Sequence, residues 1–496
     1  MMRRLVSTLA LSLALSGCIS VRDYEGPPAD PIDEGSELMR AEGDRFAREE
    51  PVIEWWRQLG DEQLNTLIEN AFVNNRDRAA AEANLRAARA ALREARRGFF
   101  PDGDVTAAYT RQVIAENAQI FGGGGAIPDF DLYDVGFDAV WEFDLFGRIS
   151  SGRDAARADF QATIADRDDL LVSLAAETAS AYVALRGAQQ QLAVAERNAE
   201  NQRESRRLTE ILLEGGRGTR LDTERARAQL DLTLATIPTL RTAVDQNIFR
   251  LSVLTGQPPA ALLDELSETG ELPSMPELIA VGDASGLLRR RPDIRRAERE
   301  LAAATAEVGV IAADLFPTVS IVGSGGYQTR TPGNLIDPKS FTLGIGPQLI
   351  WNILDFGRVR ARVDQADELS VAAAARYEQT VLLALEEAEA SLSAYGNELQ
   401  REELLRDSAV ASGEAARLAR LRYQNGVDDF LEVLDAERVA LENETLHVVS
   451  QTETFTQLIA IYKALGGGWQ STAAAEEAPP SVDAVSATPE ETGEEP

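Results

Sequence analysis

Trp141–Arg148 reads WEFDLFGR, and 210 residues later Trp351–Arg358 reads WNILDFGR. Upstream of this motif the spacing between matching residues is 216, as from Phe100-Pro101 to Phe316-Pro317. The six-residue difference therefore lies between residues 101 and 141. A repeat this long is one whole supersecondary unit used twice, with the insertion placed in a loop.

Apolar and polar residues alternate just before each copy of the motif. In the first copy Tyr133, Phe137 and Trp141 alternate with Asp134 and Asp138. A period of two predicts strands, at about residues 103–116 and 130–143 in the first repeat and 318–330 and 340–353 in the second. Strands of about ten residues suit a tilted membrane crossing, and a flanking tryptophan is typical of an interfacial girdle. An ordinary soluble hairpin is the alternative. If Trp141 faces lipid, Asp134 and Asp138 face a barrel lumen.

Long helical runs follow the motif in both repeats. Leu174, Thr178, Ala181 and Leu185 begin a 4-3 spacing of mostly apolar residues that is typical of a coiled-coil seam. Glycine turns around residues 216 and 426 end each run and lead to a returning helix. We therefore expect two coiled-coil hairpins, at about 149–255 and 358–465.

This order predicts a mostly α-helical chain with a transmembrane β-barrel, built by duplicating a helix, a β-hairpin and a long helical hairpin. The expected segments are a signal peptide (1–17), a lipidated N-terminal and equatorial segment (18–75), the first repeat (76–270), the second repeat (271–468) and a disordered acidic tail (469–496).

The composition argues against most catalytic and binding chemistry. The 496 residues carry a net charge of −32, one histidine (His447) and one cysteine (Cys18). So few His and Cys residues nearly exclude a zinc site, a disulfide framework or a Cys-His nucleophile, and we expect His447 on a helix surface. No Gly-x-Ser-x-Gly elbow is present, so neither an enzyme, a metal site nor a cofactor is expected. The missing basic, aromatic-lined patch argues against nucleic-acid binding.

The N-terminus has the features of a secretion signal. Arg3 and Arg4 precede an apolar stretch that is too short to span a bilayer as a helix. Leu15-Ser16-Gly17-Cys18 resembles a bacterial lipobox, in which Cys18 would carry lipid and become the mature N-terminus. An ordinary signal peptide with a chance cysteine is the alternative. Ile19 after the cysteine favours the outer membrane by resemblance to known sorting rules.

Four membrane strands in one chain are too few to close a barrel, because about eight is the smallest workable number. The chain must then oligomerise. Two copies would give eight strands around a filled interior, and three would give twelve around a possible channel.

Several segments, in order and duplicated, resemble the TolC/OprM-type outer-membrane efflux proteins of the NodT-type lipoprotein branch. The resemblance covers about residues 18–468 and is carried by Trp55–Asp61, Leu67–Ala71, Arg290–Glu298, the two copies of the motif, Tyr423–Gly426 and Leu431–Ala436. It implies a homotrimer with a 12-stranded barrel continuous with a periplasmic α-helical barrel. Such a trimer is a passive outer-membrane exit duct, lipid-anchored and extending into the periplasm. It works with a periplasmic adaptor and an inner-membrane pump of the RND type.

The resemblance also points to residues at the helical tips. It places two rings of gate carboxylates at Glu432 and Asp435, which an i, i+3 spacing puts on one helix face. Some members have a basic residue where this chain has Asp428, so that gate bridge does not transfer. Arg217 or Arg220 against Asp222 or Asp428 is a substitute hypothesis. The expected adaptor contacts are Gly216, Arg217, Gly218, Thr219, Gly426, Val427, Asp428 and Asp429.

Other functions stay open at this point. The nearest alternative is the same fold acting as the outer-membrane channel of a type I protein secretion system. A periplasmic adaptor also has a long helical hairpin, but it has one hairpin between soluble β-domains, whereas this chain has two. The substrate and the identities of pump and adaptor are not encoded in recognisable motifs.

Overall fold

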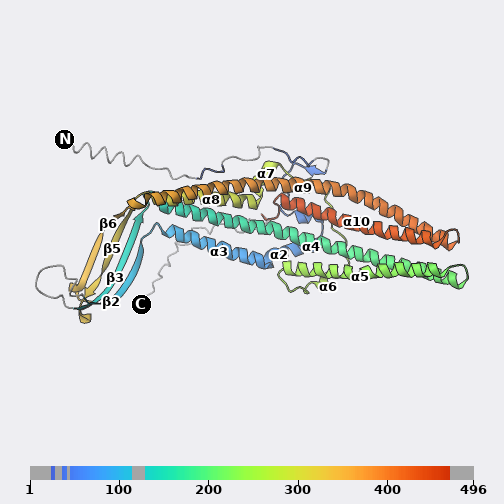
Figure 1. Cartoon of the computed structure of the whole chain (residues 1–496), viewed down its shortest axis with the longest axis horizontal. Coiled ribbons are helices and arrows are strands. Elements are labelled where there is room, and N and C mark those ends of the chain that lie inside the picture. The colour runs from blue at the N-terminus through green and yellow to red at the C-terminus, as the bar shows by residue number, and fades with distance from the viewer. Residues whose placement is uncertain (1–23, 28–35, 42–44, 114–128, 470–496) are drawn as a thin grey trace, which may run out of the picture. The chain divides into compact units, whose positions relative to one another are not determined.

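The structure is a computed structural model that describes residues 24–27, 36–41, 45–113 and 129–469 (Figure 1). The signal segment, Cys18 and the acidic tail from residue 470 lie outside the described residues. The chain divides into two compact units. The first comprises residues 82–165 and 294–380 with the segment around Tyr24, and the second comprises residues 32–81, 166–293 and 381 onward.

Helices dominate the described residues. The helices are α2 (Glu62–Asn74), α3 (Arg76–Arg97), α4 (Arg148–Glu214), α5 (Arg220–Leu254), α6 (Leu263–Leu266), α7 (Ala284–Arg290), α8 (Pro292–Ala313), α9 (Phe356–Gln424) and α10 (Phe430–Ala464), with short 3-10 turns at Trp55–Leu59, Pro332–Asn334, Pro338–Ser340 and Ile353–Asp355. The strands are β1 (Phe46–Ala47), β2 (Asp102–Gln112), β3 (Phe130–Phe143), β4 (Ile279–Ala280), β5 (Thr318–Thr329) and β6 (Phe341–Ile350). None of the described helices combines the length and the apolar character needed to cross a bilayer.

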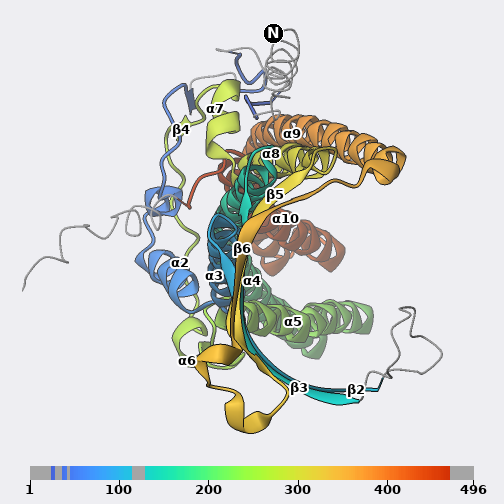
Figure 2. The ribbon, with the colours of Figure 1, turned by 90° about the vertical axis from the view of Figure 1, so that its left-hand side faces the viewer.

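The first unit holds one four-stranded antiparallel sheet in the order β2-β3-β5-β6, which Figure 2 shows as a single curved layer. Each hairpin comes from one repeat, and the β3–β5 pairing joins the repeats, with Phe143 opposite Val319. Each leading helix ends shortly before a proline, α3 before Pro101 and α8 before Pro317, and proline prevents the helix from continuing into the strand. The strand expected at 103–116 is β2, which ends at Gln112, and residues 114–116 lie outside the described residues.

The second unit holds the C-terminal parts of α4 and α9 and their returning helices α5 and α10. Its core at the N-terminal segment is aromatic: Trp55 stacks on Tyr462 with ring centroids 4.9 Å apart, and Trp56 meets Phe72 edge-on at 5.6 Å. A two-residue parallel pairing, Phe46 with Ile279, attaches the N-terminal segment to the linker between the repeats. The seam between α4 and α5 packs Ala195 and Ala199 against Leu230 and Ile237. Small alanines here let the two helix backbones approach closely.

Candidate functional site

The four-stranded sheet of the first unit has two chemically different faces. Residues opposite one another in all three strand pairings share a face. One face is apolar in every strand and carries Val105, Tyr109, Tyr133, Val135, Phe137, Trp141, Ile321, Tyr327, Phe341, Leu343, Ile345 and Leu349. Most of these side chains are exposed or half-buried, which for a contiguous apolar surface of this size indicates contact with lipid or with another chain.

Aromatic residues mark both ends of the apolar face. At one end Tyr109 lies 5.1 Å from Tyr133 between ring centroids, and at the other Trp141 lies 4.8 Å from Phe143. Tyr133 and Trp141 are eight residues apart, or about 26 Å along a strand. That spacing is close to the roughly 25 Å apolar band of outer-membrane strands.

The two tryptophans of the repeated motif make the same hydrogen bond. The Trp141 Nε1–H donates to the carbonyl oxygen of Phe99, and the Trp351 Nε1–H donates to that of Leu315, both at 3.1 Å. Each bond ties the end of a leading helix to the end of the last strand in its repeat.

The opposite face of the sheet is mostly polar, although Val140 and Val322 also lie on it. Asp134 and Asp138 lie on it, on the other side of the strand from Trp141. Asp138 accepts a hydrogen bond from the Thr106 hydroxyl and Asp134 accepts one from the Gln328 amide, each at 3.3 Å. From the sequence, we expected this face to line a barrel lumen if Trp141 faces lipid.

The first helical tip, at the far end of α4, is a glycine turn followed by a strong N-cap. Gly216 has φ +72°, a left-handed conformation that favours glycine. The amides of Arg217 and Gly218 both donate to the carbonyl oxygen of Leu212, at 2.8 and 2.9 Å. Thr219 then forms a reciprocal capping box with Asp222 at the start of α5.

The second tip repeats the turn but not the cap. Gly426 has φ +70°, and the Val427 amide donates to the Arg422 carbonyl at 3.0 Å. At the start of α10 the Asp429 side chain makes no capping hydrogen bond. Asp428 instead forms a two-point ion pair with Arg422, one contact measuring 2.8 Å. The hydrogen bonds from Arg422 lower the pKa of the Asp428 carboxyl below its usual value.

A small apolar cluster lies beneath the two tips. It contains Ala226, Tyr423, Phe430 and Val433, with Leu208 and Leu212 packed against it, so α4, α5, α9 and α10 all contribute. Burial raises the pKa of the Tyr423 hydroxyl, and the nearby negative charge of Asp222 raises it further. In the sequence, Tyr423 was used only as part of a family motif. An aromatic residue seven positions before Phe430 could have indicated that the two side chains pack together.

The predicted gate carboxylates point away from this cluster. Glu432 and Asp435 are exposed on α10, whereas Phe430 and Val433 on its other face are buried. Asp435 pairs with Arg438 at 2.9 Å. Both carboxylates therefore lie on the exposed side of α10.

The substitute bridge considered from the sequence is not formed within one described chain. Asp428 pairs with Arg422, and Asp222 is engaged in the Thr219 cap. Arg220 has Glu224 as its nearest acid, 3.9 Å away. Arg217 does reach the second tip, where its Nη2 would lie 3.1 Å from a Cβ placed on Gly426.

Sequence reasoning missed a buried carboxylate above the second tip. Glu437 is only 5% exposed, accepts a 2.6 Å hydrogen bond from the Ser205 hydroxyl of α4, and lies 3.3 Å from Arg420 Nε of α9. Burial raises the pKa of the Glu437 carboxyl. Its position continues the buried face of Phe430 and Val433, where the helical pattern would have predicted an apolar residue.

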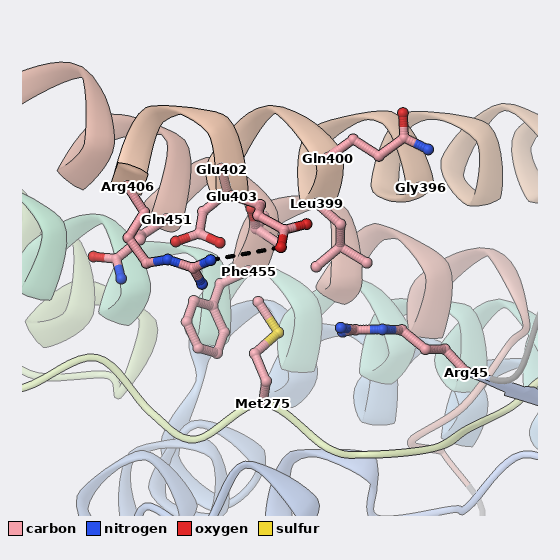
Figure 3. A pocket seen from close by; sticks show the side chains of 11 residues that line it. Arg45, Met275, Gly396, Leu399, Gln400, Glu402, Glu403, Arg406, Gln451 and Phe455 are labelled. Atoms are coloured by element: carbon pink, nitrogen blue, oxygen red, sulfur yellow. Dashed lines mark ion pairs between the residues drawn. The ribbon is translucent and has the colours of Figure 1, made fainter. Parts of the chain in front are cut away.

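A groove of about 530 Å³ lies between α9 and α10, beside the N-terminal segment (Figure 3). Arg45, Glu402, Glu403 and Arg406 line it together with Met275 and Phe455. Arg406 pairs with Glu403 at 3.6 Å. His447 Nε2 lies 3.0 Å from Glu402 Oε1. We expected His447 on a helix surface, whereas its side chain is half-buried between α9 and α10. The groove's charges thus balance one another.

Among the described residues, no group of three or more His, Cys, Asp or Glu side chains is placed to hold a metal ion. The described residues form a sheet with two chemically different faces, joined to long paired helices.

The sequence matches the family described as "Outer membrane efflux protein" over residues 67–257 and 284–467. The chain belongs to this family. The two matched segments correspond to the two repeats, each including its hairpin and coiled coil.

Individual relatives cover nearly the whole efflux protein. It is 31% identical to outer membrane protein OprJ of Pseudomonas aeruginosa, over 94% of this chain and 96% of OprJ. It is 30% identical to the antibiotic efflux pump outer membrane protein ArpC of Pseudomonas putida, over 95% and 96% of the two chains. The solved structure of the outer-membrane channel OprN is 39% identical and superposes with a TM-score of 0.84, over 90% of this chain and 99% of that one.

These similarities confirm the TolC-like fold that the resemblance implied. They also confirm the outer membrane as the location and an efflux channel as the general role. ArpC is named as the outer membrane protein of an antibiotic efflux pump.

Proposed function

We propose that this efflux protein is a passive trimeric exit duct for small molecules, with a gate at its helical tips. The observation that carries the proposal is the sheet with one apolar and one polar face and two unpaired edge strands, β2 and β6. Four strands cannot close on themselves, and three copies would supply twelve, enough to surround an aqueous lumen. Asp134 and Asp138 would then line that lumen.

The proposed gate is formed by Glu432 and Asp435 of the second tip. In a trimer these two exposed positions would bring six carboxylates near the axis, an arrangement that attracts cations and repels anions. Both tips have left-handed glycine turns, and the Arg422–Asp428 ion pair spans the second turn.

Partners at both ends follow from this role. The tip residues 216–219 and 426–429, most of them exposed, are the proposed contacts for a periplasmic adaptor, which would join the duct to an inner-membrane pump of the RND type. Cys18 is the proposed lipid attachment site. Small-molecule cargo is favoured because ArpC is named as part of an antibiotic efflux pump.

The test is single-channel conductance in a planar bilayer. The wild type should give a small, cation-selective conductance, and the Glu432→Ala/Asp435→Ala double variant should give one that is several-fold larger. A matched control is Glu224→Ala/Asp231→Ala, which removes two exposed acids from the returning helix of the first hairpin.

Absence of conductance from folded protein in every form would overturn the duct. An equal rise in the control would overturn only the assignment of the gate to Glu432 and Asp435.

A further inference from the structure

Four helix segments of the first unit lie in a row that extends from one end of the sheet (Figure 1). Arg89 of α3 lies over the Phe160 ring of α4, at 5.6 Å from the guanidinium carbon to the ring centroid. Ala158 of α4 packs against Ala302 and Ala303 of α8. Arg362 of α9 pairs with Asp314, just after α8, at 3.1 Å. The row is therefore α3, α4, α8, α9, so α3 and α9 form its two ends, as β2 and β6 form the edges of the sheet (Figure 1).

One exposed side of α3 carries a stripe of arginines, of which Arg89 also reaches α4. The arginine stripe comprises Arg86, Arg89, Arg93, Arg96 and Arg97, all exposed, at spacings that place them within about one third of the helix circumference. Arg97 lies over the Phe100 ring, as Arg89 does over Phe160. None of the five forms an ion pair with another described residue. Such a concentration of unpaired positive charge is unusual in a chain of net charge −32.

The other end of the row carries the opposite charge. Asp364, Glu368 and Glu378 of α9 are exposed, share one side of the helix, and form no ion pair among the described residues. We call these residues the acidic stripe. Arg360, one turn before Asp364, is the base on this side of the helix. Val371 and Ala375 lie between the acids and are also exposed.

The duplication supplies a template for bringing these two ends together. Within the chain, the second half of repeat one meets the first half of repeat two, through β3–β5 pairing and α4–α8 packing. The equivalent junction between two copies joins β6 to β2 and α9 to α3. Ala158 of α4 corresponds to Glu368 of α9 through the spacing of 210, and Ala302 of α8 corresponds to Arg86 of α3 through the spacing of 216. The contact between Ala158 and Ala302 within one chain therefore predicts a contact between Glu368 of one copy and Arg86 of the next.

The same transfer passes a second check on the strands. The same spacings convert the β3–β5 register, in which Phe143 pairs with Val319, into a β6–β2 register between two copies. In that register Leu349 of one copy lies opposite Ala107 of the next. Both residues lie on the apolar face. An odd shift would have placed an apolar residue opposite a polar one, whereas this register keeps both faces continuous across the junction.

We infer that the arginine stripe of α3 docks on the acidic stripe of α9 in a second copy of this chain, with Arg86 opposite Glu368, and that this charge match sets the register of assembly. The inference rests on the proposed trimer and adds its contact residues. The contact joins two different surfaces head to tail, so it closes a ring when three copies complete the rotation. Exposed ion pairs are individually weak and are screened by salt, so their main effect is to select the correct alignment.

The first test is a charge swap. Arg86→Glu and Glu368→Arg should each lower the ratio of trimer to monomer in low-salt detergent solution about tenfold, and the double variant should restore most of it. Arg376→Glu is the matched control, because Arg376 is exposed on α9 but lies off the acidic stripe. Added salt should reduce the differences among the variants.

The second test is oxidation of a cysteine pair. Arg86→Cys/Glu368→Cys should give a covalent trimer, and each single variant should not. Arg93→Cys/Glu368→Cys should remain unlinked, because seven helical residues displace the partner by about 10 Å. A trimer that forms in all variants without the cross-link would overturn the inference and leave the duct intact. Absence of any wild-type trimer, together with absence of conductance, would overturn both.

Discussion

The two leading helices, α3 and α8, hold equivalent positions in the two repeats and have opposite surfaces. Where α3 exposes Arg86 and Arg97, α8 buries Ala302 and Ala313. The backbone role is the same, since each helix runs to a proline and into the first strand of a hairpin. The difference lies in the neighbours: α8 lies between α4 and α9, whereas α3 contacts α4 on one side and has no described helix on the other. The two repeats thus share a backbone but differ in surface where their neighbours differ.

The returning helices show the same divergence. Glu437 of α10 is buried between α4 and α9, and its counterpart in α5, Arg227, is mostly exposed and pairs with Asp231 at 3.7 Å. Because equivalent residues of the two repeats share the same local backbone, the same substitution in both repeats should differ in its effect on stability only through the surrounding side chains.

The largest effect is expected at the glycines that end the returning helices. Gly256 and Gly466 both have left-handed backbones, with φ +75° and +71°. A Cβ on Gly256 would lie 2.2 Å from the Asn74 carbonyl oxygen, whereas one on Gly466 would lie 3.1 Å from Arg291 Cγ. Gly466→Ala should cost about 1–2 kcal/mol from the backbone conformation alone, and Gly256→Ala roughly 3 kcal/mol or more once the clash is added. Urea unfolding followed by circular dichroism measures both, and equal losses would contradict the comparison.

A smaller difference is expected at the helical tips. Thr219→Ala removes the capping box of α5 and should cost about 1 kcal/mol. Asp429→Ala removes a side chain that makes no cap, so it should change stability by only a few tenths of a kcal/mol. Hydrogen exchange at amides 220–223 and 430–433 reports the two caps separately. A larger rise in exchange at 430–433 on Asp429→Ala than at 220–223 on Thr219→Ala would show that the caps are misassigned.

The smallest effect is a pH dependence from Glu437. Burial raises the pKa of this carboxyl in the folded chain, so its protonated form is favoured there. Its contribution to stability is therefore present at acidic pH and is lost as the pH rises through the raised pKa. The charged group that faces it is Arg420 of α9, and α4 contributes the Ser205 hydroxyl.

Wild type should thus gain stability relative to Glu437→Gln as the pH falls toward the ordinary range of glutamate. Glu442→Gln, which removes an exposed acid from the same helix, is the control. Parallel pH curves for the wild type and Glu437→Gln would rule out a role for this carboxyl.

The parts of the fold that follow local periodicity could be predicted from the sequence. Alternation around Trp141 indicated the strands and their faces, and the glycines at residues 216 and 426 indicated the tips, because strand phase and left-handed turns depend on nearby residues. The pairing of Phe46 with Ile279 joins segments more than 200 residues apart, and no local pattern specifies it. Glu437 was missed for a related reason: a carboxylate at a buried position is tolerated only because Ser205 and Arg420 come from two other helices.

The indole hydrogen bonds of Trp141 and Trp351 have a consequence for how the sheet meets a bilayer. A tryptophan at a membrane surface commonly offers its N–H to water or lipid head groups. Here both N–H groups are engaged by backbone carbonyls at the ends of α3 and α8. The joint between strand and helix is thus closed by protein alone, and its geometry should be the same in membranes whose head groups differ.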